Sequence, residues 1–235
     1  DVRVLCNLTD NERWMETMLH EFGHAAYSAG HDANPELPFM LREAAGIFTT
    51  EGVAMMFGRL SRNPEWMRLN LGISSEEAAR IAPDCRRSAR LSQLVQSRFM
   101  QVVYRFEKAM YADPEQNLNA LWRSLVEKYQ LLTYPEGRDE PDWAAKIHIA
   151  LYPCYYHNYQ MGELFASQMH HYIVEHITRS GDMAFDSYTG CPEVGRWLTE
   201  NIFAPGKLHP WNEMISRATG EKLTAAYWAA GVSCE

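Results

Sequence analysis

The sequence lacks the features that would assign it to several common classes of protein. Its five cysteines are scattered and include no Cys-x-x-Cys pair, so neither a zinc ribbon nor a disulfide framework is expected: Cys6, Cys85, Cys154, Cys191 and Cys234. No apolar run approaches the roughly 18 residues that a membrane span needs. We therefore expect free, mostly buried thiols in a reducing compartment, which predicts the cytoplasm, with the periplasm as the alternative.

Positive charge is also scarce. The chain has 22 Lys and Arg residues against 30 Asp and Glu residues, a formal net charge of −8. A nucleic-acid-binding protein needs a basic face to meet the phosphates, and an anionic membrane surface attracts basic segments. We therefore predict neither nucleic acid nor membrane as a partner.

The chain does have the composition of a folded, helical protein. Hydrophobic residues make up 46% and aromatic residues 12% of its 235 residues, and no linker divides it. We expect one all-α domain over residues 1–235. The opening segment, residues 1–6, has neither an initiator Met nor the pattern of a secretory signal peptide. We therefore expect the C-terminal part of a longer protein.

Local signals predict the helices. Thr9 and Glu12 have the spacing of a capping box, with Thr9 as the N-cap of a first helix that Gly30 would end. Pro83 should kink or interrupt a later helix. The expected helices cover residues 41–60, 74–111, 113–129, 154–177, 193–202 and 210–229, with a short extended piece at 147–152.

One motif carries a specific chemistry. Residues 20–24 read His-Glu-Phe-Gly-His, and residues four apart lie on the same face of a helix. His20 and His24 can therefore bind one zinc ion, which in a catalytic site takes three protein ligands and leaves a position open for water. Glu21 lies beside them without being a ligand, where it can take a proton from that water.

The third ligand must come from another segment. Glu43 and Glu51 are both candidates on the expected second helix. Eight residues separate them, which is about 12 Å along a helix axis, so they cannot both bind one ion. The spacing alone does not choose between them.

Three blocks of sequence together resemble a known family. The first is His-Glu-Phe-Gly-His-Ala-Ala-Tyr at 20–27. The second is Leu-Pro-x-x-Leu-Arg-Glu from Leu37, followed after eight residues by Glu51. The third combines Lys-x-His at 146–148 with Tyr-x-x-Tyr at 156–159. These blocks resemble angiotensin-converting-enzyme-like zinc peptidases and, more broadly, the helical gluzincin group with thimet oligopeptidase and oligoendopeptidase F.

The resemblance implies a fold and a metal site. The expected fold places the His-Glu-x-x-His helix beside a glutamate-bearing helix, and together these two helices line a cleft. His20, His24 and Glu51 would hold Zn²⁺, with Glu21 as general base and acid. Glu43 would belong to the wall of the active site.

The resemblance also assigns roles in the third block. Lys146 would bind the C-terminal carboxylate of a peptide substrate, and His148 and Tyr159 would stabilise the oxyanion. Tyr156 would help to hold the substrate end. Tyr155 stays a rival to Tyr156, because the spacing from His148 to Tyr159 is one residue longer than in the family.

The chain departs from the family in two ways. Met55 stands where the family has an acidic residue near the zinc, so any supporting contact must come from elsewhere. Family members are usually more than twice as long, and their helical N-terminal portion lines the other wall of the cleft. We expect such a portion of the same protein to complete the cleft here.

These observations predict zinc-dependent hydrolysis of peptide bonds in short peptides. A Lys146 that binds the substrate carboxylate would favour a dipeptidyl carboxypeptidase, whereas a solvent-facing Lys146 would favour an oligoendopeptidase. The alternatives are a catalytically silent zinc- or peptide-binding module, or an inactive fragment, and a helical interaction protein without metal. Among the remaining histidines, we expect His31 in a loop near the cleft and His170 and His171 on the surface.

Overall fold

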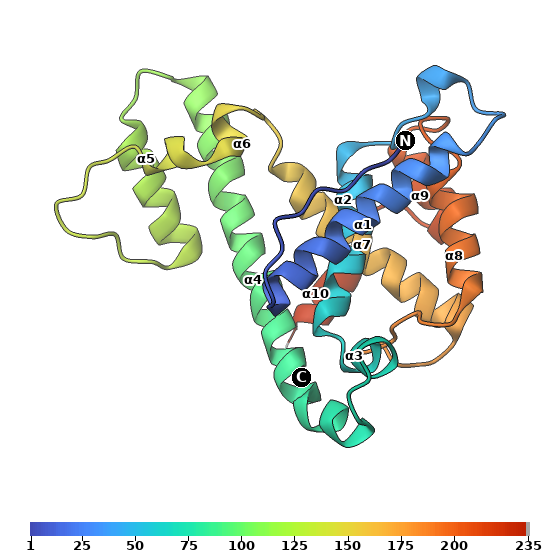
Figure 1. Ribbon diagram of the computed structural model, residues 1–235. Helices are drawn as coiled ribbons and strands as arrows, with labels where there is room; N and C mark the ends of the chain where they lie inside the picture. Colours follow the sequence, from blue (N-terminus) through green and yellow to red (C-terminus); the bar gives the residue numbers. More distant parts are fainter. Residues whose placement is uncertain (234–235) are drawn as a thin grey trace. The chain divides into compact units, whose positions relative to one another are not determined.

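The computed structural model describes residues 1–233, and over this range the chain forms helices and no strand (Figure 1). The all-α prediction is therefore confirmed. The α-helices are α1 (Glu12–Asp32), α2 (Ile47–Gly58), α3 (Pro64–Leu71), α4 (Ser75–Ala112), α5 (Leu118–Leu125), α6 (Ile147–Ala150), α7 (His157–Tyr172), α8 (Pro192–Leu198), α9 (Trp211–Thr219) and α10 (Ala226–Val232). Wider π turns continue α5, α7 and α8, over Val126–Gln130, Ile173–Thr178 and Thr199–Phe203.

Contacts group the chain into two compact units. The first unit contains Asp1–Arg90 and the chain from Met161 onward, and the second contains Leu91–Gln160. α4 and α7 each contribute residues to both units. The expectation of a single catalytic domain, forming the C-terminal part of a longer peptidase, stays a prediction.

α1 and α2 pack against each other in the first unit, as the dark blue and cyan ribbons of Figure 1 show. α2 is apolar on nearly all sides and is buried along most of its length. A helix of this kind belongs inside a core rather than on a surface. Val53 and Ala54 of α2 are fully buried, and Phe165, Ile202 and Ile215 are fully buried elsewhere in the first unit.

Two glycines of α1 allow close approach to neighbouring segments. A Cβ at Gly23 would lie 2.6 Å from the Ala54 Cα, and a Cβ at Gly30 would lie 2.4 Å from the Phe203 Cβ. The predicted C-cap at Gly30 is therefore wrong: the helix continues to Asp32. The glycine serves tertiary packing, which is a contact between distant segments that a local pattern does not reveal.

The first helix also begins differently from the prediction. Asn11, and not Thr9, is the N-cap of α1, and its side chain accepts a hydrogen bond from the Trp14 amide at 3.0 Å. Thr9 contributes indirectly, because its hydroxyl accepts a hydrogen bond from the Asn11 side-chain amide at 2.8 Å. The Glu12 that was expected at the third helical position is the first helical residue.

The predicted start of the second helix at Leu41 is wrong, because α2 begins only at Ile47. A single 3₁₀ turn, Phe39–Leu41, precedes it. The Leu41 carbonyl accepts a hydrogen bond from the Lys207 amide at 2.9 Å, so it is already used by a distant loop. Gly206, with a φ of +50°, allows that loop to approach. Gly46 is extended and is the N-cap of α2, so Glu43 lies outside the helix.

The second unit has its own core on α4, α5 and α6. Val102, Val103 and Phe106 of α4 are fully buried, and the Phe106 ring meets Trp122 of α5 edge to face at 5.1 Å. α5 starts at Leu118 and not at Asp113, because Asn117 caps it by accepting from the Ala120 amide at 2.9 Å. The chain between α4 and α5 is a turn.

Two further local predictions are corrected. The expected extended piece at 147–152 is the helical turn α6, so its alternating pattern did not indicate a strand. α4 starts as expected, with the Glu77 amide bonded to the Ser74 hydroxyl at 3.0 Å, and it continues through Pro83. Pro83 therefore does not interrupt the helix, and a kink there stays a prediction.

The cysteines are more exposed than predicted. Cys6, Cys85 and Cys191 are half-buried and Cys154 is exposed, so none of these four is a core thiol. Cys234 lies outside the described residues. No helix within residues 1–233 is both long and apolar enough to cross a membrane.

Candidate metal centre

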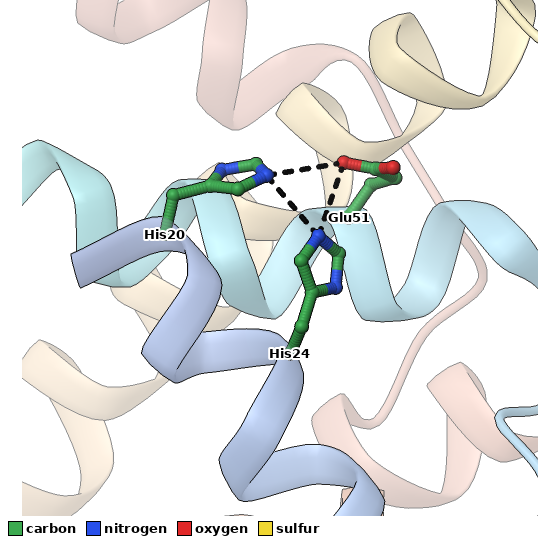
Figure 2. Close-up of side chains that lie close together, drawn as sticks. All are labelled: His20, His24 and Glu51. Atoms are coloured by element: carbon green, nitrogen blue, oxygen red, sulfur yellow. Dashed lines mark hydrogen bonds and ion pairs between the residues drawn. The ribbon is translucent and has the colours of Figure 1, made fainter. Parts of the chain in front are cut away.

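Three side chains that are candidate metal ligands converge between α1 and α2. The Nε2 atoms of His20 and His24 lie 3.1 Å apart, and the Glu51 Oε2 lies 3.5 and 3.7 Å from them. Figure 2 shows the two rings on α1 directed toward the carboxylate on α2. This group is the one cluster of potential metal ligands found among the described residues.

The spacing of these atoms fits a zinc ion. Zinc bonds of 2.0–2.1 Å in tetrahedral geometry place neighbouring ligand atoms about 3.3 Å apart. The three observed separations lie close to this value. Two imidazoles and one carboxylate also leave a fourth position open, which distinguishes catalytic from structural zinc sites.

Two glycines, Gly52 and Gly162, let α2 and α7 approach closely beside Glu51. A Cβ at Gly52 would lie 2.8 Å from the Phe165 ring, and a Cβ at Gly162 would lie 3.0 Å from the Glu51 Cβ. α2 and the part of α7 in the first unit therefore pack with almost no space between them. The Glu51 side chain is only 4% exposed as a result.

Two sets of polar contacts hold α1 against the α2 segment. At one end, Arg62 lies within 2.8 Å of Glu16 and 3.1 Å of Glu12. At the other end, the Tyr27 hydroxyl lies 3.2 Å from the Thr49 hydroxyl at the start of α2. Because the histidines lie between these contacts on α1, the relative position of the two helices fixes the separation of the three ligand atoms.

The ring of His24 has a second partner. Its Nδ1 lies 2.8 Å from the Thr50 hydroxyl, while its Nε2 faces the other ligands. Burial lowers the pKa of His24, with the negative charge of Glu51 opposing this effect. A lowered pKa favours the neutral imidazole that a metal requires. The sequence did not predict this role for Thr50. Met55, which stands where the family has an acidic residue, is buried.

Glu21 and Glu43 lie in different surroundings. Glu21 is half-buried on α1, and its charge acts on His24. Glu43 is exposed and forms an ion pair with Lys207. The hydrogen bond that the Lys207 ammonium donates to the Glu43 carboxylate lowers the pKa of this carboxyl. Glu51, and not Glu43, thus joins the two histidines, and the role of Glu43 in an active-site wall stays a prediction.

The remaining predicted site residues gather in the second unit. The His148 Nε2 lies 3.0 Å from the Tyr159 hydroxyl, so the two expected oxyanion donors contact each other. The rings of Tyr155 and Tyr156 pack against His148, with centroids 5.6 and 5.2 Å away. The Lys146 ammonium lies over the Tyr156 ring at 5.2 Å and over the Phe99 ring at 5.5 Å. The catalytic and substrate-binding roles of these residues stay predictions.

The comparison with known proteins found a match to one family model. Residues 143–233 match the model for the carboxypeptidase Taq (M32) metallopeptidase family. The match covers 91 of the 235 residues (233 − 143 + 1). It lies C-terminal to the three candidate ligands and contains Lys146, His148 and Tyr159. Together with the ligand cluster, the match supports a metallopeptidase.

The fold is similar to that of a solved structure. The crystal structure of BsuCP matches with a TM-score of 0.68 and 18% sequence identity, over 92% of this chain and 46% of the BsuCP chain. This chain therefore spans about half the length of BsuCP. No sequence among curated proteins matches. These findings support the broader prediction of a helical metallopeptidase, and the closer likeness to converting enzymes or oligopeptidases stays a prediction.

Two of three other histidines, His31 and His170, do not lie where they were expected. His31 is the second-last residue of α1 and is buried, with its ring 6.0 Å from that of Tyr27. His170 is half-buried, bonded through Nδ1 to the Tyr188 hydroxyl and through Nε2 to the Met183 carbonyl at 3.0 Å. His171 is half-buried, with its Nδ1 3.4 Å from Glu175. The surface prediction for His170 is wrong, because the 180–190 loop covers it.

Proposed function

We propose that this chain is the catalytic part of a zinc-dependent metallopeptidase that cleaves short peptides. The convergence of His20, His24 and Glu51 on one point carries this proposal, because three such ligands with an open fourth position are the donor set of a hydrolytic zinc site. The match to a metallopeptidase family supports it independently, since the matched residues exclude all three ligands.

We base the proposed roles of the protein groups on the resemblance to zinc peptidases. Zinc, when bound, would polarise the scissile carbonyl and lower the pKa of a water molecule. Glu21 would take the proton of the attacking water and transfer it to the amine that leaves. His148 and Tyr159, already in mutual contact, would donate hydrogen bonds to the oxygen on which negative charge develops.

We further propose that the enzyme acts at a free C-terminus. A carboxypeptidase family model matches the segment that contains Lys146. The Lys146 ammonium contacts the faces of two mutually perpendicular rings, Phe99 and Tyr156, and these contacts favour one position of the side chain. Such an ammonium suits a substrate carboxylate. The size of the released product distinguishes a carboxypeptidase, which releases single amino acids, from the dipeptidyl carboxypeptidase that the resemblance favours.

The first experiment measures metal content and turnover together. The purified chain should bind about one zinc per molecule, Glu51→Ala should lose most of it, and Glu43→Ala should retain it. A quenched peptide with a free C-terminus should be cleaved by the parent and by Glu43→Ala. Glu21→Gln should retain zinc and lose turnover by at least about 100-fold. A parent without zinc, or equal zinc in parent and Glu51→Ala, would contradict the proposed ligand set.

The second candidate function is a zinc- or peptide-binding module without catalysis. It is favoured by the fact that the chain spans about half the length of BsuCP. We propose that an N-terminal portion of the same protein completes the cleft and that short peptides are the substrate. Zinc binding without turnover by the chain, equal in parent and Glu21→Gln, would favour the silent module. Turnover that depends on Glu21 would exclude it.

A further inference from the structure

The hydrogen bond between His24 and Thr50 links the two helices of the metal centre. The His24 Nδ1 lies 2.8 Å from the Thr50 Oγ1, and both side chains are half-buried. Thr50 directly precedes the ligand Glu51 on α2. One turn of α2 therefore supplies a metal ligand and a partner for the imidazole of another ligand.

The state of the His24 ring decides whether it can bind a metal. A neutral imidazole carries its proton on one nitrogen and a lone pair on the other. The Nε2 faces the Nε2 of His20 at 3.1 Å and the Glu51 Oε2 at 3.7 Å, so the lone pair must be on Nε2 for His24 to be a ligand. This tautomer carries its proton on Nδ1 and donates it to the Thr50 oxygen. The hydrogen-bond partner of the second nitrogen commonly fixes the tautomer of a metal-binding histidine.

We propose that Thr50 is a positioning residue that holds His24 in the Nδ1–H tautomer and orients its Nε2 toward the metal. Thr50 is the hydrogen-bond partner that the structure gives to the His24 Nδ1. A hydroxyl is a neutral acceptor, so it orients the ring without the added negative charge of a carboxylate. This inference deepens the proposed function and rests on it only for the identity of the bound metal.

The test uses one disruptive variant, one rescuing variant and one matched control. Thr50→Val keeps the shape of the side chain and removes the oxygen, while Thr50→Ser keeps the oxygen. Thr199→Val removes an exposed threonine hydroxyl that bonds the Gly195 carbonyl at 2.8 Å, far in sequence from the metal ligands. Competition with a chromogenic chelator gives the zinc affinity. We expect a 10- to 100-fold loss in Thr50→Val, the range that follows loss of such partners, and less than about 3-fold change in the other two.

A second readout does not depend on metal at all. The ¹⁵N shifts of the His24 ring, recorded without metal above about pH 8, distinguish the two neutral tautomers. The parent and Thr50→Ser should show Nδ1–H, and Thr50→Val should show a mixture or Nε2–H. Thermal unfolding of each variant identifies loss of the fold.

The outcomes separate this inference from the proposed function. An Nε2–H tautomer in the parent, or parental zinc affinity and an unchanged tautomer in folded Thr50→Val, would overturn the role of Thr50. A parent that shows Nδ1–H but binds no zinc would contradict the metal site and leave the role of Thr50 in fixing the tautomer supported. Failure of Thr50→Ser to rescue the affinity would also overturn the role, because it would show that the hydroxyl is not what matters.

Discussion

His24 and His170 are two half-buried histidines of the first unit with opposite surroundings. Both have pKa values lowered by burial, so both are held as neutral rings. One ring nitrogen of His24 bonds Thr50 while the other faces His20 and Glu51. His170 has both nitrogens occupied by groups that do not bind metal, the Tyr188 hydroxyl and the Met183 carbonyl.

The difference shows that burial of a histidine does not by itself indicate a metal site. At His24 one nitrogen is directed toward other ligands, and the ring serves chemistry. At His170 both nitrogens connect α7 to the 180–190 loop, and the ring serves stability. Since the Met183 carbonyl can only accept, the Nε2 of His170 carries the proton and Nδ1 accepts from Tyr188. The two rings are therefore predicted to be opposite tautomers.

The largest expected effect separates the two histidines by metal affinity. His24→Ala removes one of three ligands, so zinc binding should weaken by more than about 100-fold, beyond the effect of losing a hydrogen-bonding partner. His170→Ala should leave zinc affinity unchanged. It should instead lower the free energy of unfolding by about 1–3 kcal/mol, because the buried Tyr188 hydroxyl loses its partner. Zinc titration and denaturant unfolding of both variants measure this.

The comparison fails if the two variants behave alike. Equal loss of zinc in His170→Ala would mean that the 180–190 loop also controls the metal site. A loss of stability in metal-free His24→Ala as large as that in His170→Ala would mean that His24 is also a structural histidine. His176→Ala, at an exposed position, serves as the control for histidine removal.

The next effect tests how the metal centre depends on helix packing. A Cβ at Gly23 would meet the Ala54 backbone at 2.6 Å, and no side-chain rotation can relieve such a contact. We expect Gly23→Ala to push α1 and α2 apart, at a cost of about 1–3 kcal/mol in the free energy of unfolding. Zinc affinity should fall as well, because the two histidines are on α1 and Glu51 is on α2, so separating the helices also separates the ligands.

Gly195→Ala is the matched control for this variant. A Cβ at Gly195 would have no atom within 4 Å, and the residue lies within α8. Alanine should stabilise this helix by about 0.5–1 kcal/mol and leave zinc affinity unchanged. Parental zinc affinity in Gly23→Ala would show that the ligand geometry does not depend on this close approach. Neither substitution changes the partners of His170, so its tautomer should be the same in both variants as in the parent.

The sequence was sufficient to predict the two histidine ligands and Glu21, but not to choose the third ligand or the residues that position it. His20, Glu21 and His24 follow from one local pattern, because four residues make about one helical turn. Choosing Glu51 over Glu43 required either the resemblance or the structure, since both were expected on one helix. Glu43 lies outside α2 because Gly46 is extended and is the N-cap of the helix. The segment before Gly46 also contacts a distant loop, since the Lys207 amide donates to the Leu41 carbonyl across more than 160 residues.

The same reasoning explains the other corrections. Gly30 looked like a helix end because a glycine can take a left-handed conformation, yet it lies opposite Phe203 and inside the helix. His170 was expected on the surface because the sequence implied no carboxylate partner for it, whereas its partners are a hydroxyl and a carbonyl of the 180–190 loop. Thr50 had no local signal at all: its hydroxyl acts on His24, which lies on another helix. Periodicity predicts elements, whereas these roles depend on pairs of elements.

The smallest expected effect is the part of the pH dependence of stability that His170 contributes, beside the part from His24, whose pKa burial also lowers. Because burial lowers the pKa of His170 in the folded state, the unfolded chain binds the proton more readily. The free energy of unfolding should therefore fall as pH decreases from about 6.5 toward the lower folded pKa, and the penalty should become constant below it. The positive charge of Arg59 acts in the same direction, Asp186 opposes it, and the Met183 hydrogen bond favours the protonated ring. The slope from this one group cannot exceed about 1.4 kcal/mol per pH unit.

Two variants identify the source of this slope in metal-free protein. His170→Gln cannot titrate, so its free energy of unfolding should be lower at neutral pH but should fall less steeply between pH about 7 and 5. Tyr188→Phe removes the hydroxyl and leaves the ring buried, so it should retain most of the slope. Denaturant unfolding at a series of pH values measures both. If His170→Gln kept the parental slope, His170 would not be titrating with a lowered pKa. If Tyr188→Phe lost the slope, the hydrogen bond rather than burial would set the proton affinity, and His170 would resemble His24 in depending on one partner.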